Sequence, residues 1–113
     1  MMHAIAYRRD VYMALKLRFD EVACREDFNI TLRLLRAGLN NVVCYDYCVS
    51  PAAYNASGGA SMERTVQSSN REAERLAKLH PDFVRLVDRE YKNVPRKEVV
   101  VYWKRAYQSG LSA

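Results

Sequence analysis

Two adjacent carboxylates, Glu26 and Asp27, are the residues of this sequence whose type and spacing best suit acid–base chemistry. They open a stretch with apolar residues at helical spacing, namely Phe28, Leu32, Leu35 and Leu39. Free N–H groups and the macrodipole at a helix N-terminus keep a carboxylate ionised, so one of the pair could take a proton from an attacking hydroxyl. Adjacent helical residues point about 100° apart, so only one can face a cleft. The spacing does not say which.

The same pair also has a purely structural interpretation. Acidic residues are common in the first turn of a helix, because their charge complements the macrodipole. Periodicity alone therefore does not distinguish a catalytic base from an ordinary helix start.

Helices must position the pair, and four are predicted. The main one is predicted over residues 25–38 and ends at Gly38, since glycine adopts the left-handed conformation that follows a helix end at no cost. A second is predicted over 67–79, with Ala73 and Leu76 buried and Glu72 in solvent. A short helix is predicted over 7–15, and His80-Pro81 is expected to start another, with Phe83, Val84 and Val87 inward.

Two segments are predicted as strands. Residues 42–49 are β-branched or aromatic on both parities, as in a strand covered on both faces, and residues 98–103 alternate. The fold class is therefore α/β, in the form of an α+β fragment with few strands packed with three to four helices. Residues 1–107 are assigned to one domain and 108–113 to a frayed tail.

Residues 50–65 form a long segment of small residues with paired glycines, Gly58 and Gly59. Such glycines let a backbone approach a ligand closely, and Arg64 could meet a phosphate in a bidentate way. A plain linker is the alternative, because the Lys-Ser/Thr signature of a phosphate-binding loop is absent.

Composition limits the classes of protein to consider. The chain has 113 residues and a net charge of +5, which suits a polyanionic partner but equally a basic surface that only aids solubility. It contains no apolar run of membrane-spanning length and no signal peptide. Three cysteines, an odd number, favour reduced thiols and a cytoplasmic location.

Several segments, in this order, resemble the second half of a GT-A type nucleotide-sugar glycosyltransferase. The first are Tyr7-Arg8-Arg9-Asp10-Val11, Arg18-Phe19-Asp20-Glu21 and Glu26-Asp27-Phe28 through Gly38. The later ones are similar to the tail of the phage glycosyltransferases known as TET-associated: Gly58-Gly59-Ala60-Ser61 with Arg64, Leu79-His80-Pro81 with Phe83-Val84, and Val101 with Trp103-Lys104-Arg105-Ala106-Tyr107.

The resemblance implies an activity and a site. It implies transfer of a sugar from a nucleotide-sugar donor to a hydroxyl acceptor, with a hydroxymethylated pyrimidine in phage DNA as the acceptor. Asp27, or second Glu26, would be the catalytic base. The residues expected to bind substrate are Arg25, Ser57, Gly58, Gly59 and Arg64.

The resemblance also indicates a missing part. GT-A enzymes hold the donor diphosphate and a divalent metal, Mn²⁺ or Mg²⁺, on an amino-terminal βαβ half that carries an Asp-x-Asp motif. This sequence has no such motif and no strand–helix alternation before Tyr7. We therefore expect the acceptor-side half of a longer enzyme, without a metal site of its own. It should be inactive alone, and either need the missing half or self-associate through an exposed strand edge.

A non-enzymatic basic module that binds nucleic acid or assists assembly is the rival interpretation. Aromatic and basic residues are interleaved near both ends, in Tyr7-Arg8-Arg9 and Tyr102-Trp103-Lys104-Arg105, which suits stacking and backbone contacts. Against it, the acid pair would repel phosphate, and no nucleic-acid-binding signature is present.

Overall fold

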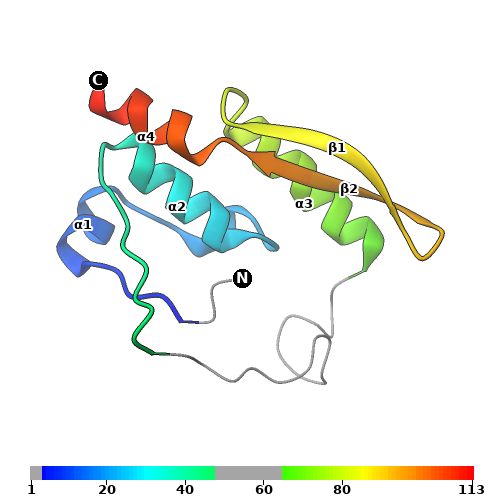
Figure 1. The fold of residues 1–113 in the computed structure, drawn as a ribbon, viewed down its shortest axis with the longest axis horizontal. Helices are drawn as coiled ribbons and strands as arrows, with labels where there is room; N and C mark the ends of the chain where they lie inside the picture. The colour runs from blue at the N-terminus through cyan, green and yellow to red at the C-terminus, as the bar shows by residue number, and fades with distance from the viewer. Residues whose placement is uncertain (1–3, 48–64) are drawn as a thin grey trace.

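The computed structural model describes residues 4–47 and 65–113, and over these ranges the chain mixes helices with an antiparallel hairpin (Figure 1). In chain order the elements are α1 (Arg9–Ala14), the 3₁₀ turn η1 (Phe19–Glu21), α2 (Glu26–Arg36), α3 (Val66–Leu79), β1 (Val84–Tyr91), β2 (Val94–Val101) and α4 (Trp103–Leu111). This confirms the predicted mixture of helices and strands. None of the described helices has the length and apolar character needed to cross a membrane.

Helix α2 lies where the sequence predicts it, and its two ends explain why. Arg25 precedes it in a left-handed conformation, with φ of 68°, so the chain turns sharply into the helix. At the other end Gly38 has φ of 77°. The N–H of Gly38 donates to the carbonyl of Leu35 at 2.9 Å, and that of Leu39 to Leu34 at 3.1 Å. These two bonds form a Schellman motif, which confirms the predicted end at Gly38.

Helix α3 begins at Val66, one residue before the predicted start, because a capping box fixes it there. The hydroxyl of Thr65 accepts the Ser68 N–H at 3.0 Å, and the Ser68 hydroxyl accepts the Thr65 N–H at 2.9 Å. The prediction that Glu72 faces solvent is wrong. Glu72 is only 6% exposed, and its carboxylate accepts a hydrogen bond from the backbone N–H of Ala23 at 2.9 Å.

The hairpin replaces two predicted elements. The segment after Pro81 is not a helix: it is a turn that leads into β1, and β2 starts at Val94 rather than at residue 98. Positive φ at both Lys92 (49°) and Asn93 (60°) closes the hairpin as a type I′ turn. Pairing with β2 satisfies the backbone groups of β1, and one face of the ladder carries apolar pairs to the core: Val84 with Val101 and Leu86 with Val99.

Two further expectations differ from the structure. Residues 42–47 do not form the predicted strand but are irregular and exposed, with Val42 81% and Tyr45 90% exposed. A strand needs a neighbour for its N–H and C=O groups, and the described residues place none beside it. Residues 48–49 lie outside the described ranges. At the other end, α4 continues to Leu111, through most of the stretch expected to fray.

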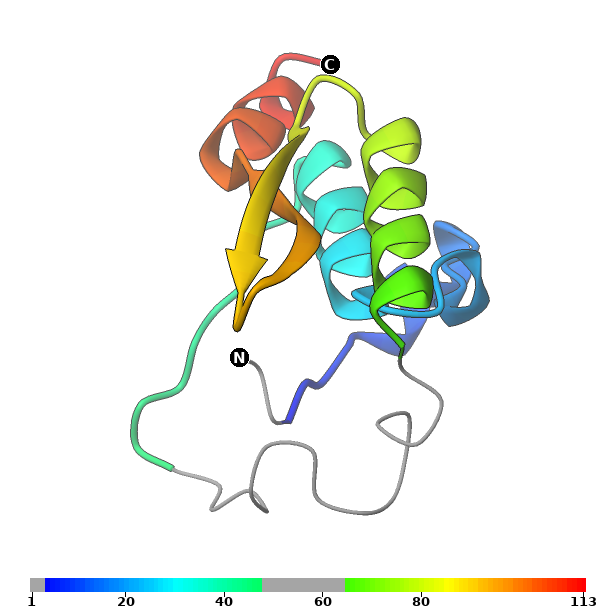
Figure 2. The same ribbon diagram turned by 90° about the vertical axis from the view of Figure 1, so that its right-hand side faces the viewer.

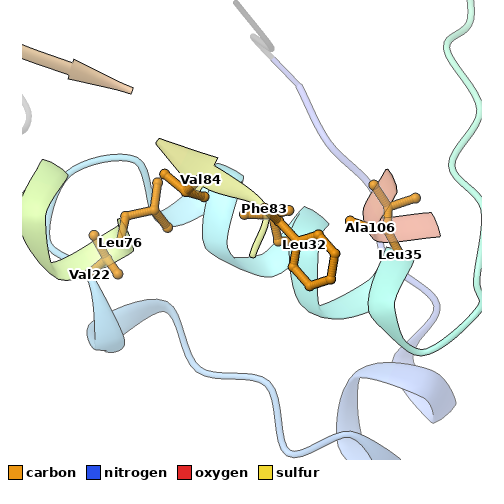
Figure 3. Packing of buried hydrophobic residues seen from close by; sticks show 7 residues of the cluster. All are labelled: Val22, Leu32, Leu35, Leu76, Phe83, Val84 and Ala106. Carbon is orange, nitrogen blue, oxygen red and sulfur yellow. The ribbon is translucent and has the colours of Figure 1, made fainter. Parts of the chain in front are cut away.

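The core joins elements far apart in the sequence. Figure 3 shows its seven buried members: Val22, Leu32, Leu35, Leu76, Phe83, Val84 and Ala106. Helix α3 lies along the hairpin, and α4 crosses the carboxyl-terminal end of α2 (Figures 1 and 2). At the start of α2, Arg25 contacts both α3 and β2.

Candidate functional site

Glu26 and Asp27 form the first turn of α2, and both are partly buried. The Asp27 Oδ1 accepts the N–H of Phe28 at 3.0 Å, which accords with the attraction of negative charge to a helix N-terminus. No lysine or arginine of the described ranges lies within ion-pair distance of either carboxylate.

This lack of a cationic partner distinguishes the pair from the other acids of similar burial. Each remaining buried or partly buried acid of the described chain has a cation nearby: Glu21 with Arg33 at 2.9 Å, Glu72 with Arg71 at 3.8 Å, Glu74 with Lys97 at 3.6 Å, and Glu98 with Arg25 at 3.6 Å. These four acids have structural roles that account for them. Glu26 and Asp27 have no such ion pair within the described chain.

Arg25 anchors the start of α2 to the rest of the fold. Its Nη1 donates to the Ser69 carbonyl on α3 at 3.2 Å, and its Nη2 lies 3.6 Å from the Glu98 carboxylate on β2. The side chain is thus engaged within the protein and holds the acid pair in place. Its expected contact with substrate stays a prediction.

The sequence did not predict that Tyr7 would lie close to the acid pair. The pKa of its phenol is raised, first by burial and then by the negative charge of Asp27, with Tyr12 and Glu26 adding to the effect. The Tyr7 hydroxyl is shielded from solvent and has no hydrogen-bond partner in the described chain. The sequence pattern placed Tyr7 only on the apolar side of a short helix, because its approach to α2 is a long-range contact.

A hollow of about 640 Å³ lies between α2 and α4. Its apolar wall includes Phe28 and Trp103, whose rings meet edge to face at 5.2 Å, together with Tyr107. The polar residues of its lining are Thr31, Asn40, Asn41 and Lys104. Glu26 and Asp27 do not line it, and its lining residue Thr31 lies one helical turn beyond Asp27.

The other expected substrate-binding residues, Ser57, Gly58, Gly59 and Arg64, lie outside the described ranges. Whether they approach the acid pair stays a prediction. A divalent metal does not fit the described residues: no three histidine, cysteine or acidic side chains converge there as a ligand set.

No protein-family model, no curated protein and no solved structure matched this chain. The resemblance to GT-A enzymes therefore depends on the sequence motifs alone. The geometry around α2 is the independent basis for a functional proposal.

Proposed function

We propose that this chain is the acceptor-side part of a nucleotide-sugar glycosyltransferase in which Asp27 is the catalytic base. The observation that carries the proposal is that Glu26 and Asp27 are the partly buried acids for which the described chain provides no cation. A carboxylate held at a fixed helix start, without an ion pair, keeps lone pairs available for a proton.

Asp27 is favoured over Glu26 by its neighbours. Phe28 follows it directly and Thr31 lies one turn beyond, and both line the aromatic hollow. We propose that a planar acceptor ring stacks against Trp103 or Tyr107 in this hollow, with its hydroxyl substituent directed toward the start of α2. A hydroxymethylated pyrimidine, the acceptor that the family resemblance implies, has this combination of flat ring and primary hydroxyl.

The proposed step is a displacement at the anomeric carbon of the donor sugar. The acceptor oxygen forms a bond to that carbon while its proton passes to the Asp27 carboxylate. The bond between the anomeric carbon and the diphosphate oxygen breaks, and the nucleoside diphosphate leaves with the electron pair. Under this proposal, the groups that bind the diphosphate belong to a donor-binding half outside this polypeptide.

The test is a transfer assay with the complete enzyme, a panel of radiolabelled nucleotide sugars and DNA that contains hydroxymethylated pyrimidines. We expect Asp27→Asn to lower kcat by roughly 10²- to 10⁴-fold, as for loss of a general base, without a change in the unfolding midpoint. Glu26→Gln is the matched control and should lower kcat only a few-fold. Normal turnover by Asp27→Asn would remove Asp27 from this role.

The same assay separates the enzyme from a binding module. The 113-residue chain alone should give no transfer, and transfer by it would show that no separate donor half is needed. Tight DNA binding with no transfer from any donor, even by the complete protein, would favour the non-enzymatic alternative.

A further inference from the structure

The outward face of the β1–β2 hairpin carries an excess of arginine. The register places Arg85, Val87, Arg89 and Tyr91 of β1 opposite Val100, Glu98, Arg96 and Val94 of β2 on this face. The free edge of β2 lies against α3, where the backbone N–H of Lys97 donates to the Asn70 Oδ1 at 2.9 Å and the Lys97 Nζ lies 3.6 Å from the Glu74 carboxylate. Figure 2 shows α3 along that side of the hairpin. The single acid of the outward register, Glu98, already pairs with Arg25.

Arg89 and Arg96 lie directly opposite each other in the antiparallel ladder. Like charges in this position destabilise a sheet, because their side chains leave the same face about 5 Å apart at Cβ. Neither arginine forms an ion pair with a carboxylate of the described chain. The repulsion between them is therefore not relieved within the described fold.

Arg96 also has an unsatisfied donor. Its Nε is buried and has no hydrogen-bond partner in the described chain, while its guanidinium lies 5.2 Å from the Tyr91 ring. An unpaired buried N–H is rare and costly, and an arginine held over an aromatic ring keeps the edges of its guanidinium available. Lys92 adds a third positive charge, with its Nζ 5.6 Å from the same ring.

These side chains surround a shallow hollow of about 550 Å³. Its lining includes Arg89, Arg96 and Tyr91, together with Val87, Glu90 and Glu98. Glu98 is compensated by Arg25, and Glu90 belongs by register to the other face of the ladder. The hollow thus offers two arginines without acidic partners to an anion small enough to sit between them.

We propose that Arg89 and Arg96 form a phosphate-binding site on the outward face of the hairpin. A phosphate between the two guanidinium groups would relieve their repulsion and supply the oxygen that the Arg96 Nε lacks. The phosphate can belong to a free nucleotide or to a nucleic-acid backbone. In either case Tyr91, 57% exposed, leaves a ring beside the site for a base to stack on. The site does not depend on the proposed transferase activity.

The test follows the arginine side chains by ¹H–¹⁵N NMR during titrations of the 113-residue chain. The three probes are inorganic phosphate, a nucleoside diphosphate and a single-stranded oligothymidylate. We expect a saturable shift of the Arg96 Nε–Hε signal. Arg89→Gln and Arg96→Gln should each weaken binding about tenfold or more, a loss of about 1.4 kcal/mol. Arg96→Lys should also weaken it, because an ammonium cannot replace the planar fork.

Arg85→Gln is the matched control, since it removes the same charge from the same face but does not line the hollow. It should weaken binding less than threefold. Saturation by phosphate and nucleoside diphosphate alone would identify a nucleotide as the source, and preference for the oligothymidylate would identify a nucleic-acid backbone. An equal loss for Arg85→Gln, or no Arg96 shift with any probe, would overturn the site. Because Gln at position 89 or 96 removes a repulsion, both variants should melt at or above the midpoint of the parent, which excludes unfolding as the cause.

Discussion

Arg36 donates a hydrogen bond from its Nη1 to the Nδ1 of His80 at 3.1 Å, which fixes the protonation state of this buried histidine. A guanidinium can only donate, so Nδ1 is the acceptor and the ring proton resides on Nε2. That N–H donates in turn to the Asn29 Oδ1 at 2.8 Å, and the Asn29 amide donates to Glu21 at 2.8 Å. The bonds with Arg36 and Asn29 satisfy both ring nitrogens of His80, which is 2% exposed.

This chain of bonds predicts a loss of stability in mild acid. Burial, and then the nearby Arg36 and Arg33, lower the pKa of His80 from 6.5 to about 4. Between pH 6.5 and about pH 4, His80 binds a proton in the unfolded chain but stays neutral in the folded protein. The free energy of unfolding should therefore fall as the pH drops from 6.5 to 4, by up to about 3 kcal/mol. Urea unfolding at a series of pH values measures this slope.

His80→Gln is the control for that pH dependence. The variant should lose most of the slope between pH 6.5 and 4, even if it is less stable throughout. Hydrogen bonds from Arg8 and Arg18 lower the carboxyl pKa of Asp10 and Asp20 below the usual 3.8, so these groups lose stabilisation only as the pH approaches 3.8. That loss is common to the parent and the variant, and the comparison between them isolates His80. An unchanged slope in the variant would contradict the assignment to His80.

Gly110→Ala should destabilise the protein although it lies in a helix. A Cβ there would collide with the Leu35 carbonyl and come within 2.5 Å of the Gly38 nitrogen, where α4 crosses the end of α2. In an unobstructed helix the same change gains about 1 kcal/mol, whereas overpacking costs roughly 1–3 kcal/mol. Thermal unfolding decides between the two signs. Ser109→Ala, at the exposed neighbouring position, should be neutral or slightly stabilising.

Glu72→Ala should cost roughly 1–3 kcal/mol, because it leaves the Ala23 N–H without its acceptor. Glu72→Gln keeps an acceptor oxygen and should cost less. Chemical unfolding gives the two energies, and amide hydrogen exchange at Ala23 should accelerate in the alanine variant. Equal effects of the two substitutions would show that the charge matters, rather than the bond to Ala23.

Replacing Lys92-Asn93 by Asn-Gly should stabilise the hairpin by about 1 kcal/mol. Both positions have positive φ, which costs lysine more than it costs asparagine or glycine. Lys92→Ala is the control: it removes the lysine side chain but keeps a residue unsuited to this conformation, so it should give no gain. A higher midpoint for Lys92→Ala alone would point to side-chain contacts instead.

Residues 42–47 should drive self-association, because Val43 and Tyr45 are 63% and 90% exposed. The variant Val43→Lys/Tyr45→Lys should sediment as a smaller species than the parent at the same concentration. Asn41→Lys, which adds charge without removing apolar surface, should leave the sedimentation unchanged. Identical behaviour of all three would contradict this role.

The sequence predicted the elements whose signals are local. Helices α2 and α3 carry strong apolar periodicity, and Gly38 marks the end of α2. The hairpin was missed because Lys92-Asn93 is not a typical I′ sequence, and because β1 loses its apolar alternation after Val87. Residues 42–47 have strand composition without a strand beside them, and only tertiary structure can show that.

Within the candidate site, too, only the residues with a local sequence signal could be predicted. The acid pair was found from its place at a helix start, which the sequence shows directly. The anchoring of Arg25 by Ser69 and Glu98, and the approach of Tyr7, join residues more than sixteen positions apart and leave no local pattern. The arginine pair of the hairpin could not be predicted until the register was known.

The position of the core relative to residues 42–47 makes this protein a natural candidate for fragment complementation. Val22, Leu32 and Leu35 precede that exposed segment, while Leu76, Phe83, Val84 and Ala106 follow it, and all seven share one cluster. A protease that cuts between Val42 and Tyr47 would leave two peptides, each with half of a shared interior. When the two peptides are expressed from separate genes, they should therefore associate and restore the structure at the start of α2 without a covalent link.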